Sequence, residues 1–466
     1  MAATRELRTV WKRFALVGII LIVSLVVRAG TSHFLAERID DGAWFQHGSY
    51  RIFDARAQGI LDGTEPVFFL NDPTRTDLVQ YPPGFPLLVA FIYQVTGERS
   101  AMSVLRVIWW LDALATPLLL LALGTAAFGR RAGYWSAALG AFSPLLAYYG
   151  VTPSSDAVTT WLVLGALWSL LLAVKRRSWP IALIAGGILG LACWFRVNPL
   201  FLTFAWGVGV LLITSVPLRL RAAIGAAVVV GTIAIAAPIP IRNAIVFKQF
   251  VLTGLNVGSN LWEGLGETEL GNQHGFRYGD QVMVEVERAE LGLPADFPIT
   301  PVWPDGIARD RERARRAMSF IAERPVWYFG VMLTRMYWML KIAGDPGPYY
   351  GTAGINCTRA KCLPVELQSG PAAVIIDLLG MIQSVLRYIT IPLAAVGLWC
   401  GLRRHRAATL VLLVTVLYYL VGGTAAHTEL RYVLPMHSAL VVLAGLAFSQ
   451  VPFTITRNTQ YQPVPE

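Results

Sequence analysis

Two adjacent carboxylates, Asp40 and Asp41, stand a few residues after the first long apolar run of the chain, residues 14–34. Carboxylates are among the side chains that exchange protons in catalysis. Basic residues precede this run, so we expect a signal anchor with its N-terminus in the cytoplasm. Both aspartates would then lie at the opposite membrane surface, where an enzyme meets a substrate whose tail stays in lipid. The alternative is that they only cap the next helix or keep a loop solvated.

Other polar side chains that could do chemistry are expected at the same face. Asp156, Arg196, Arg242 and the segment HTELRY at residues 427–432 all fall at one end of predicted helices. The ionisable residues of a transporter would instead mark a path through the middle of the membrane. The pattern therefore favours an enzyme that works at the membrane surface.

The composition predicts an all-α polytopic membrane protein. Of 466 residues, 55% are hydrophobic and 15% are charged, whereas an average soluble protein has about 25% charged residues. Apolar runs long enough to cross a hydrocarbon core of about 30 Å recur along the chain. Lys and Arg, which give a formal net charge of +10, cluster between these runs. Such clusters are typical of cytoplasmic loops and not of a nucleic-acid-binding surface.

We expect about ten transmembrane helices, each long enough to cross the bilayer. They are predicted at residues 14–34, 103–128, 133–149, 158–174, 180–195, 199–215, 222–241, 374–400, 407–422 and 433–448. Two further apolar stretches, 84–96 and 325–341, are short or interrupted by charge and are expected to lie in the outer interface.

This organisation divides the chain into three parts. Residues 1–241 form an N-terminal transmembrane module whose first outer loop, 37–98, is the catalytic one. Residues 242–371 form an extracytoplasmic loop region with interfacial helices. Residues 372–466 hold the C-terminal transmembrane helices and a cytoplasmic tail.

Four cysteines are too few for a disulfide framework. Cys193 and Cys400 fall in apolar runs and are expected to be packed thiols. Cys357 and Cys362 share a polar loop and either form a disulfide in an oxidising compartment or stay reduced. His427 and Glu429 lack a third ligand nearby, so we predict no metal site.

A series of short motifs resembles the GT-C membrane glycosyltransferases, in particular the branch of the protein O-mannosyltransferases and the transferases that add aminoarabinose to lipid A. The acidic pair is followed by Trp44 and Phe45, then by a small-residue helix ending in a glycine and by a proline pair. The later motifs keep the family's order. The matching segments are 40–45, 57–63, 81–86, 143–149 with Asp156, 195–199, 241–243, 260–264 and 429–432.

The resemblance implies a GT-C-like bundle that transfers a sugar from a polyprenyl-phosphate carrier to an extracytoplasmic acceptor, with inversion. Asp40 is the expected general base, with Asp41 as its alternative or partner and Asp54 as a third candidate. Arginine matches phosphate oxygens, so Arg431 is expected to bind the donor phosphate. Arg196, Arg242 and Lys341 are further candidates for that role.

Tyr81, Asp156 and Glu429 are expected to bind substrate. Asp156 could instead act only as a helix N-cap, Tyr81 could only shape a turn, and Arg431 could simply reach the interface from a helix end.

The sugar donor is a substrate, and no cofactor is implied. The resemblance places the protein in the cell inner membrane with its site on the periplasmic face, and the acceptor is a protein, a lipid or a glycan. The rival functions are a flippase for a lipid-linked saccharide and an envelope glycan ligase or polymerase.

Overall fold

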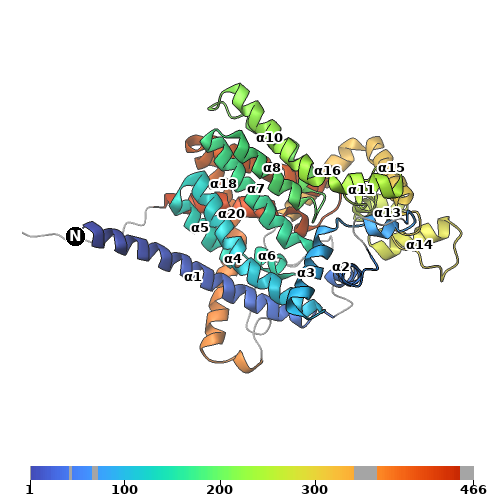
Figure 1. The fold of residues 1–466 in the computed structure, drawn as a ribbon, viewed down its shortest axis with the longest axis horizontal. Helices are drawn as coiled ribbons and strands as arrows, with labels where there is room; N and C mark the ends of the chain where they lie inside the picture. The colour runs from blue at the N-terminus through green and yellow to red at the C-terminus, as the bar shows by residue number, and fades with distance from the viewer. Residues whose placement is uncertain (1, 41–44, 66–71, 341–364, 452–466) are drawn as a thin grey trace, which may run out of the picture.

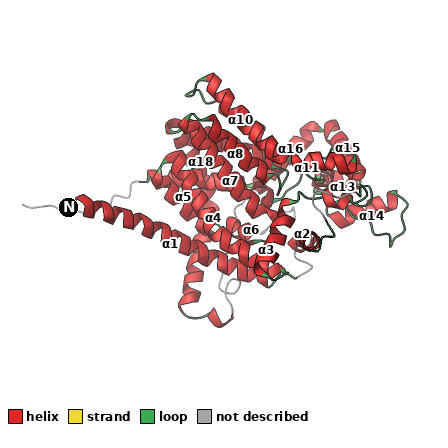
Figure 2. Cartoon of the chain, in the orientation of Figure 1, coloured by secondary structure: helices red, strands yellow, loops and turns green. Residues whose placement is uncertain are grey.

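The structure is a computed structural model, and it describes residues 2–40, 45–65, 72–340 and 365–451. Within these ranges the chain is helical and forms no strand. Figures 1 and 2 show α-helices throughout, with the helices of the outer loop region gathered at the end of the molecule opposite the N-terminus of α1.

The N-terminal half holds eleven α-helices, most of them apolar. They are α1 (Ala2–Ala36), α2 (Phe45–Leu61), α3 (Gly84–Thr96), α4 (Ala101–Phe128), α5 (Arg130–Phe142), α6 (Pro144–Val151), α7 (Ser155–Arg176), α8 (Trp179–Ala192), α9 (Pro199–Leu211), α10 (Leu218–Ala236) and α11 (Pro238–Phe247). A short 3₁₀ turn, η1 (Thr76–Val79), precedes α3.

The rest of the chain forms an outer group of helices and then returns to the bundle. The outer group is α12 (Val257–Gly266), α13 (Glu269–Gln273), α14 (Asp280–Glu290), α15 (Gly306–Glu323) and α16 (Pro325–Met339). The return consists of η2 (Val365–Leu367), α18 (Pro371–Arg404), α19 (Arg406–Thr424), η3 (Leu430–Val433) and α20 (Leu434–Gln450).

The prediction of a polytopic helical membrane protein is confirmed. Six helices in the described residues are long and apolar enough to cross a bilayer, and the bent helix α18 makes seven if it counts as one span. The count is below the expected ten because the apolar runs at 133–149, 180–195 and 199–215 form shorter helices. The first of these runs breaks at Ser143, which caps α6, and Pro144, which starts it.

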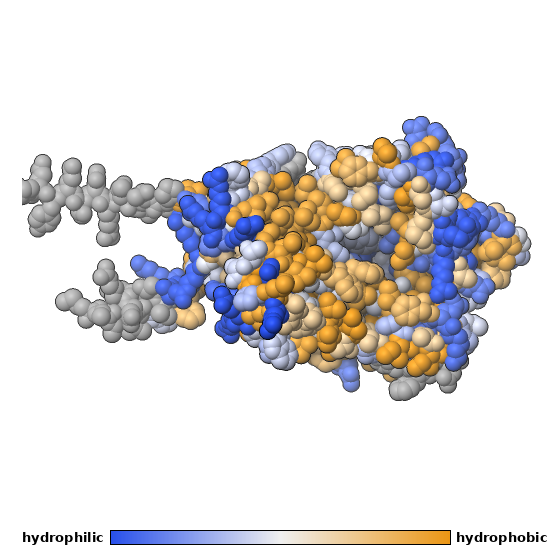
Figure 3. Space-filling model, turned by 90° about the horizontal axis from the view of Figure 1, so that it is seen from above, coloured by the Kyte–Doolittle hydropathy of each residue, from blue (hydrophilic) through white to orange (hydrophobic). Residues whose placement is uncertain are grey.

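The apolar surface forms a broad band between two hydrophilic ends, as Figure 3 shows. Inside the band, α20 is almost completely enclosed, and it packs on α18, α5 and α19. Helices α8 and α10 approach closely because glycines face the neighbouring backbone. A Cβ on Gly186 would lie 2.2 Å from the carbonyl oxygen of Val228. Small residues of this kind let membrane helices pack tightly.

One pair of opposite charges lies inside the membrane-spanning part. Arg28 of α1 and Asp112 of α4 form an ion pair of 2.7 Å, and both are buried. The guanidinium group also donates to the carbonyl oxygens of Ala141 and Gly140, at 2.9 and 3.3 Å. Asp112 accepts from the indole nitrogen of Trp161 at 2.7 Å. The pair was not expected from the one-sided charge pattern, and its contacts link four helices, α1, α4, α5 and α7.

Candidate functional site

A pocket of about 510 Å³ lies where the bundle meets the outer group of helices. Its walls come from α2, from the start of α7, from the break between α8 and α9, from α12 and from the turn between α19 and α20. These segments are far apart in the sequence, so the fold itself assembles the pocket. Its charged lining residues are Asp156, Arg196, Glu263, Asp280, Glu429 and Arg431, together with His427.

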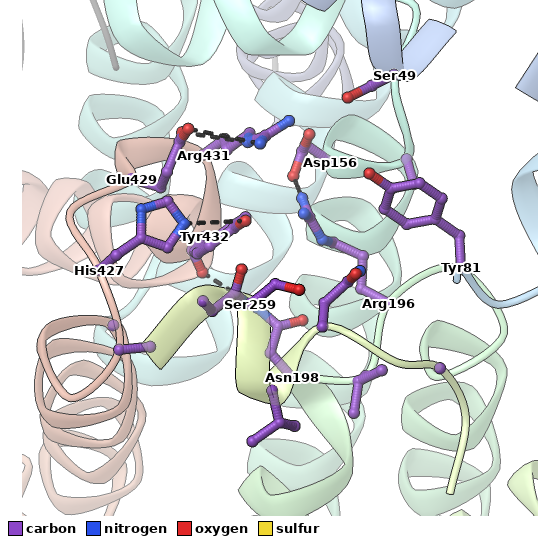
Figure 4. Close-up of a pocket in the computed structure, with 18 of the residues that line it drawn as sticks. Ser49, Tyr81, Asp156, Arg196, Asn198, Ser259, His427, Glu429, Arg431 and Tyr432 are labelled. Carbon is purple, nitrogen blue, oxygen red and sulfur yellow. Dashed lines mark hydrogen bonds and ion pairs between the residues drawn. The ribbon is translucent and has the colours of Figure 1, made fainter. Parts of the chain in front are cut away.

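The first buried pair in the pocket joins Asp156 and Arg196 (Figure 4). Asp156 stands in the first turn of α7, and its carboxylate accepts from the Ser154 hydroxyl at 2.8 Å. Arg196 lies in the short break that Pro199 closes before α9. Burial lowers the pKa of Arg196 to about 10, which leaves the guanidinium group charged at neutral pH. The N-cap alternative for Asp156 fits only in part, because Ser154 caps this helix and Asp156 pairs with arginine.

The second buried pair joins Glu429 and Arg431, whose Oε2 and Nε atoms are 3.1 Å apart. Both belong to the extended turn that leads through η3 into α20. The guanidinium carbons of Arg431 and Arg196 lie 5.3 and 4.6 Å from the ring centre of Tyr432. Figure 4 shows both arginines extending toward the same space beside Asp156. Two half-buried cations that share one aromatic neighbour are a fitting site for an anionic group.

A network of hydrogen bonds and an ion pair, centred on Arg335 and Glu267, holds the turn of residues 424–429 in place. Arg335 of α16 is fully buried, and it donates to the carbonyl oxygens of Thr424 and Ala426 at 3.0 and 2.8 Å. Its Nε lies 3.2 Å from Glu267. Glu267 in turn accepts from the backbone NH of Thr428 at 2.8 Å. The outer helices are thereby fastened to the turn that carries Glu429.

His427 of this turn also lines the pocket. Its Nδ1 lies 3.6 Å from Glu267 and its Nε2 lies 3.4 Å from the Tyr432 hydroxyl. Burial lowers the pKa of His427, but the nearby negative charges of Glu267, Glu429 and Glu263 outweigh this and raise it. The imidazole is therefore held more readily in its cationic form.

The outer group of helices supplies the remaining wall, which holds Glu263 of α12 and Asp280 at the start of α14. The sequence analysis matched Glu263 to a motif but gave it no role, and it did not consider Asp280. Burial, followed by the charge of Asp280, raises the pKa of Glu263 to about 7. The signal that could have suggested Glu263 is a lone carboxylate inside the apolar segment NLWEG.

Five of the predicted site residues lie together in the pocket lining: Tyr81, Asp156, Arg196, Glu429 and Arg431. The other candidates that the structure describes do not line it. Arg242 lies on α11 and donates to its neighbour Asn243 at 2.9 and 2.6 Å.

The first-loop aspartates that the structure describes, Asp40 and Asp54, are not among the lining residues. Asp40 is exposed in the turn after α1. Asp54, on α2, accepts from Tyr93 at 2.5 Å and from Gln58 at 3.1 Å. Asp41, Lys341, Cys357 and Cys362 fall outside the described residues. Cys193 is buried and Cys400 half-buried, both with free thiols.

No group of three or more His, Cys, Asp or Glu side chains suited to a metal ion occurs in the part of the chain that the structure describes. The charged lining is arranged as carboxylate–arginine pairs, with two further carboxylates on the outer wall.

One family model and several solved structures are similar to this chain. The family model described as dolichyl-phosphate-mannose-protein mannosyltransferase matches residues 80–241. A search of curated proteins finds no match.

Among solved structures, the archaeal oligosaccharyltransferase AglB from Archaeoglobus fulgidus, in complex with an inhibitory peptide and a dolichol-phosphate, is similar with a TM-score of 0.50 and 14% identity. That match covers 94% of this chain and 50% of the other. The apo form of the Archaeoglobus enzyme gives a TM-score of 0.50 at 16% identity, over 94% of this chain and 51% of that one.

ArnT from Cupriavidus metallidurans, bound to undecaprenyl phosphate, gives a TM-score of 0.48 at 14% identity, over 95% of this chain and 61% of that one. The chain thus spans about half the length of the Archaeoglobus enzyme it matches. At these identities the likeness concerns the fold. The resemblance predicted from the sequence is confirmed, and the chain is a multi-pass membrane protein with the fold of the GT-C glycosyltransferases.

Proposed function

We propose that this protein is an inverting glycosyltransferase that takes its sugar from a polyprenyl-phosphate carrier. The observation that carries the proposal is the pocket with two arginines, Arg196 and Arg431, each 16% exposed, where the apolar bundle meets its outer helices. A carrier with a lipid tail and a phosphate head group needs a site with an apolar side for the tail and a cationic side for the phosphate. The GT-C fold and the family match over residues 80–241 support the same function, and the similar Archaeoglobus enzyme was solved with a dolichol-phosphate.

In the proposed reaction an acceptor hydroxyl attacks the anomeric carbon of the donor. The bond from this carbon to the phosphate oxygen breaks, and its electron pair leaves with the lipid phosphate. Arg431, with Arg196 beside it, stabilises the negative charge that develops on the leaving group. Arg242 and Lys341 remain weaker candidates, because Arg242 lies outside the lining and Lys341 outside the described residues.

The acceptor proton goes to a carboxylate. The sequence predicts Asp40 or Asp41 for this role, and both belong to the proposal as first-loop candidates. Ser49, which follows them on α2, lines the pocket. Tyr81 and the pairs of Asp156 and Glu429 would contact the sugar or hold the arginines in place. A single displacement of this kind inverts the anomeric configuration.

We propose a bacterial inner-membrane location with the pocket on the periplasmic side, because the basic turns lie at the opposite end of the bundle. The rival flippase would need charges along a membrane path. Arg28 and Asp112, which lie inside spanning helices, are bonded to each other and do not line the pocket. No observation favours that rival.

The purified protein in nanodiscs should transfer label from a polyprenyl-phosphate sugar to membrane lipids, glycans or proteins. Mass spectrometry of cell envelopes with and without the gene identifies the acceptor to use. Arg431→Lys should lower kcat/KM by about 100-fold, since one lost transition-state donor costs that much. Arg315→Lys, on the exposed face of α15, should leave transfer unchanged.

Transfer by wild type and Arg431→Lys at equal rates would reject the arginine assignment. Absence of transfer with every polyprenyl-phosphate sugar, while the protein moves such lipids across vesicles, would replace the enzyme with the flippase. Full activity of both Asp40→Asn and Asp41→Asn would reject the first loop as the source of the base.

A further inference from the structure

Two uncharged polar groups in the pocket lining have no hydrogen-bond partner within the part of the chain that the structure describes. One is the hydroxyl group of Tyr419 on α19, a residue that is only 2% exposed. The other is the Oδ1 atom of Asn198, which precedes α9. Buried polar groups nearly always have a partner, because a group without one costs free energy. A polar ligand in the pocket would supply both partners.

The side chain of Asn198 is held so that its oxygen is the free atom. Its Nδ2 atom donates to the backbone carbonyl oxygen of Tyr432 at 3.2 Å (Figure 4). A carbonyl oxygen can only accept, so the amide nitrogen must face Tyr432 and Oδ1 is left over. The hydroxyl group of Tyr418 donates to the backbone carbonyl oxygen of Asn198. Asn198 is therefore fixed on two sides and offers an acceptor.

The contacts of Asn198 place it beside the two arginines of the pocket. Tyr432, its hydrogen-bond partner, has the guanidinium carbons of Arg196 and Arg431 at 4.6 and 5.3 Å from its ring centre. A chemical group bonded to an anion between these arginines would therefore lie close to Asn198. Tyr419 belongs to the same region, because its ring centre is 5.2 Å from that of Tyr418.

The wall formed by α9 and α19 is both firm and open. The indole nitrogen of Trp206 on α9 donates to the hydroxyl group of Thr415 on α19 at 2.9 Å, which fastens the two helices together. Gly422 follows Tyr419 by about one helical turn and also lines the pocket. A Cβ on Gly422 would meet no atom within 4 Å. The glycine thus leaves room for a ligand beside polar groups that sit on rigid elements, as precise recognition requires.

We infer that Tyr419 and Asn198 bind the sugar ring of the donor and determine which sugar the protein accepts. This inference rests on the proposed function, in which Arg196 and Arg431 hold the donor phosphate. The sugar is bonded directly to that phosphate, so its hydroxyl groups are the polar groups nearest to Asn198. One sugar hydroxyl donates to the Oδ1 atom of Asn198, and another forms a hydrogen bond with the hydroxyl group of Tyr419. The lipid tail needs neither contact.

Tyr419→Phe tests the inference, because it removes only the hydroxyl group without a partner. The donor is the undecaprenyl-phosphate sugar that wild type transfers fastest among the glucose, mannose, galactose and aminoarabinose forms. For this donor kcat/KM should fall by about tenfold, the loss expected for one neutral hydrogen bond. The affinity for undecaprenyl phosphate without a sugar should not change. The thermal transition should stay the same or rise, since the protein loses no hydrogen bond of its own.

Monodeoxy analogues of this donor show which sugar hydroxyl each residue contacts. Wild type should transfer one analogue about tenfold more slowly than the complete sugar, and Tyr419→Phe should lose this preference. Asn198→Ala should lose the preference at a different hydroxyl. A merely structural role would lower the rates for all analogues alike and leave both preferences in place.

Ser438→Ala is the matched control. Ser438 lies on α20, is fully buried and likewise has a hydroxyl group without a partner among the described residues, but it does not line the pocket. Its replacement should leave kcat/KM and every sugar preference unchanged.

The inference is overturned if Tyr419→Phe keeps the wild-type kcat/KM for the donor. It is equally overturned if Tyr419→Phe binds undecaprenyl phosphate without a sugar as weakly as it binds the donor. The proposed function survives both results, because wild type still transfers sugar. That function fails only if wild type transfers none of the four sugars.

Discussion

Arg28 and Asp112 carry opposite charges into the membrane-spanning part of the molecule, where an unpaired charge is expensive. The guanidinium group is bonded on three sides, to Asp112, Ala141 and Gly140. The Asp112 carboxylate accepts from Trp161 and Thr116, at 2.7 and 2.5 Å. The two opposite charges therefore neutralise each other, and both side chains have hydrogen-bond partners. The pair belongs to the packing of α1 against α4 and not to the pocket.

Removal of one partner tests this interpretation at the scale of the residue. Asp112→Leu leaves a buried guanidinium group without its counter-ion, which should destabilise the protein by about 3–5 kcal/mol. The thermal transition of the protein in detergent should fall by several degrees, as followed by tryptophan fluorescence. The transfer kcat of the folded fraction should stay at the wild-type value, because neither residue lines the pocket.

The double variant Arg28→Met with Asp112→Leu provides the control. It removes both charges at once and should recover most of the lost stability, since apolar replacements of a buried pair are often neutral. If the single and double variants are equally unstable, the charges themselves are not the cause.

At the scale of the element, α16 connects the outer helix α12 to the end of α19. One face of this helix is exposed and apolar, with Val326, Phe329 and Leu333 at helical spacing. The opposite face carries the fully buried Arg335, which contacts α12 through Gly264 and the end of α19 through Thr424. The sequence analysis regarded Arg335 as a charge that interrupts a span. Its contacts show why a charge belongs there.

Arg335→Lys should loosen the outer helices. Besides the four groups named above, the guanidinium group of Arg335 contacts the Tyr328 hydroxyl at 3.2 Å. Lysine has three donors on one atom and cannot reach all five groups. Hydrogen exchange of residues 257–290 should become faster, and KM for the donor should rise by about tenfold or more. Arg315→Lys, at a side chain that is 70% exposed, is the matched control and should change neither measurement.

Gly264→Ala probes the same contact from the other side. A Cβ on this residue would lie 1.8 Å from the carbonyl oxygen of Ala426, so α12 and the turn must separate. Wild-type exchange and wild-type KM in both variants would show that α16 does not position the pocket.

Some helix bounds could be predicted from the sequence, whereas α1 begins at Ala2, well before the predicted residue 14. The predicted stretch at 84–96 agrees with α3 (Gly84–Thr96). Short helices were harder, because a run such as 199–215 has the composition of a span whether it stops at Leu211 or continues. Local sequence cannot distinguish these cases, since packing against neighbouring helices decides where a short apolar helix ends.

The candidate site could be predicted only in part, for a reason that belongs to the whole molecule. Arg196, Arg431 and Asp156 stand at ends of apolar helices, where a charge is conspicuous in the sequence. Asp280 comes from an outer region in which charged residues are common, so nothing local marks it, and the only local signal for Glu263 is its place in the apolar segment NLWEG. They reach the pocket because the outer helices fold back over the end of the bundle.

The whole-molecule arrangement also predicts which end faces which compartment. The basic turns gather at one end: Arg131 donates to the carbonyl oxygen of Val451, and Arg404 lies 2.6 Å from Gln450. Arg177 likewise reaches the turn before α10 at Ser215, at 3.5 Å. Because basic loops usually stay in the cytoplasm, we propose that α14 and α15 lie on the other side of the membrane.

Single cysteines in a background without the natural ones test this arrangement. Glu285→Cys, on exposed α14, should react with a membrane-impermeant maleimide in spheroplasts, whereas Arg176→Cys should react only after the membrane is opened. Both positions are exposed, so access to the reagent and not burial decides the difference. Labelling of Arg176→Cys in closed spheroplasts, with Glu285→Cys protected, would show that the molecule has the opposite orientation in the membrane. The pocket would then face the cytoplasm, and an extracytoplasmic acceptor could not reach it.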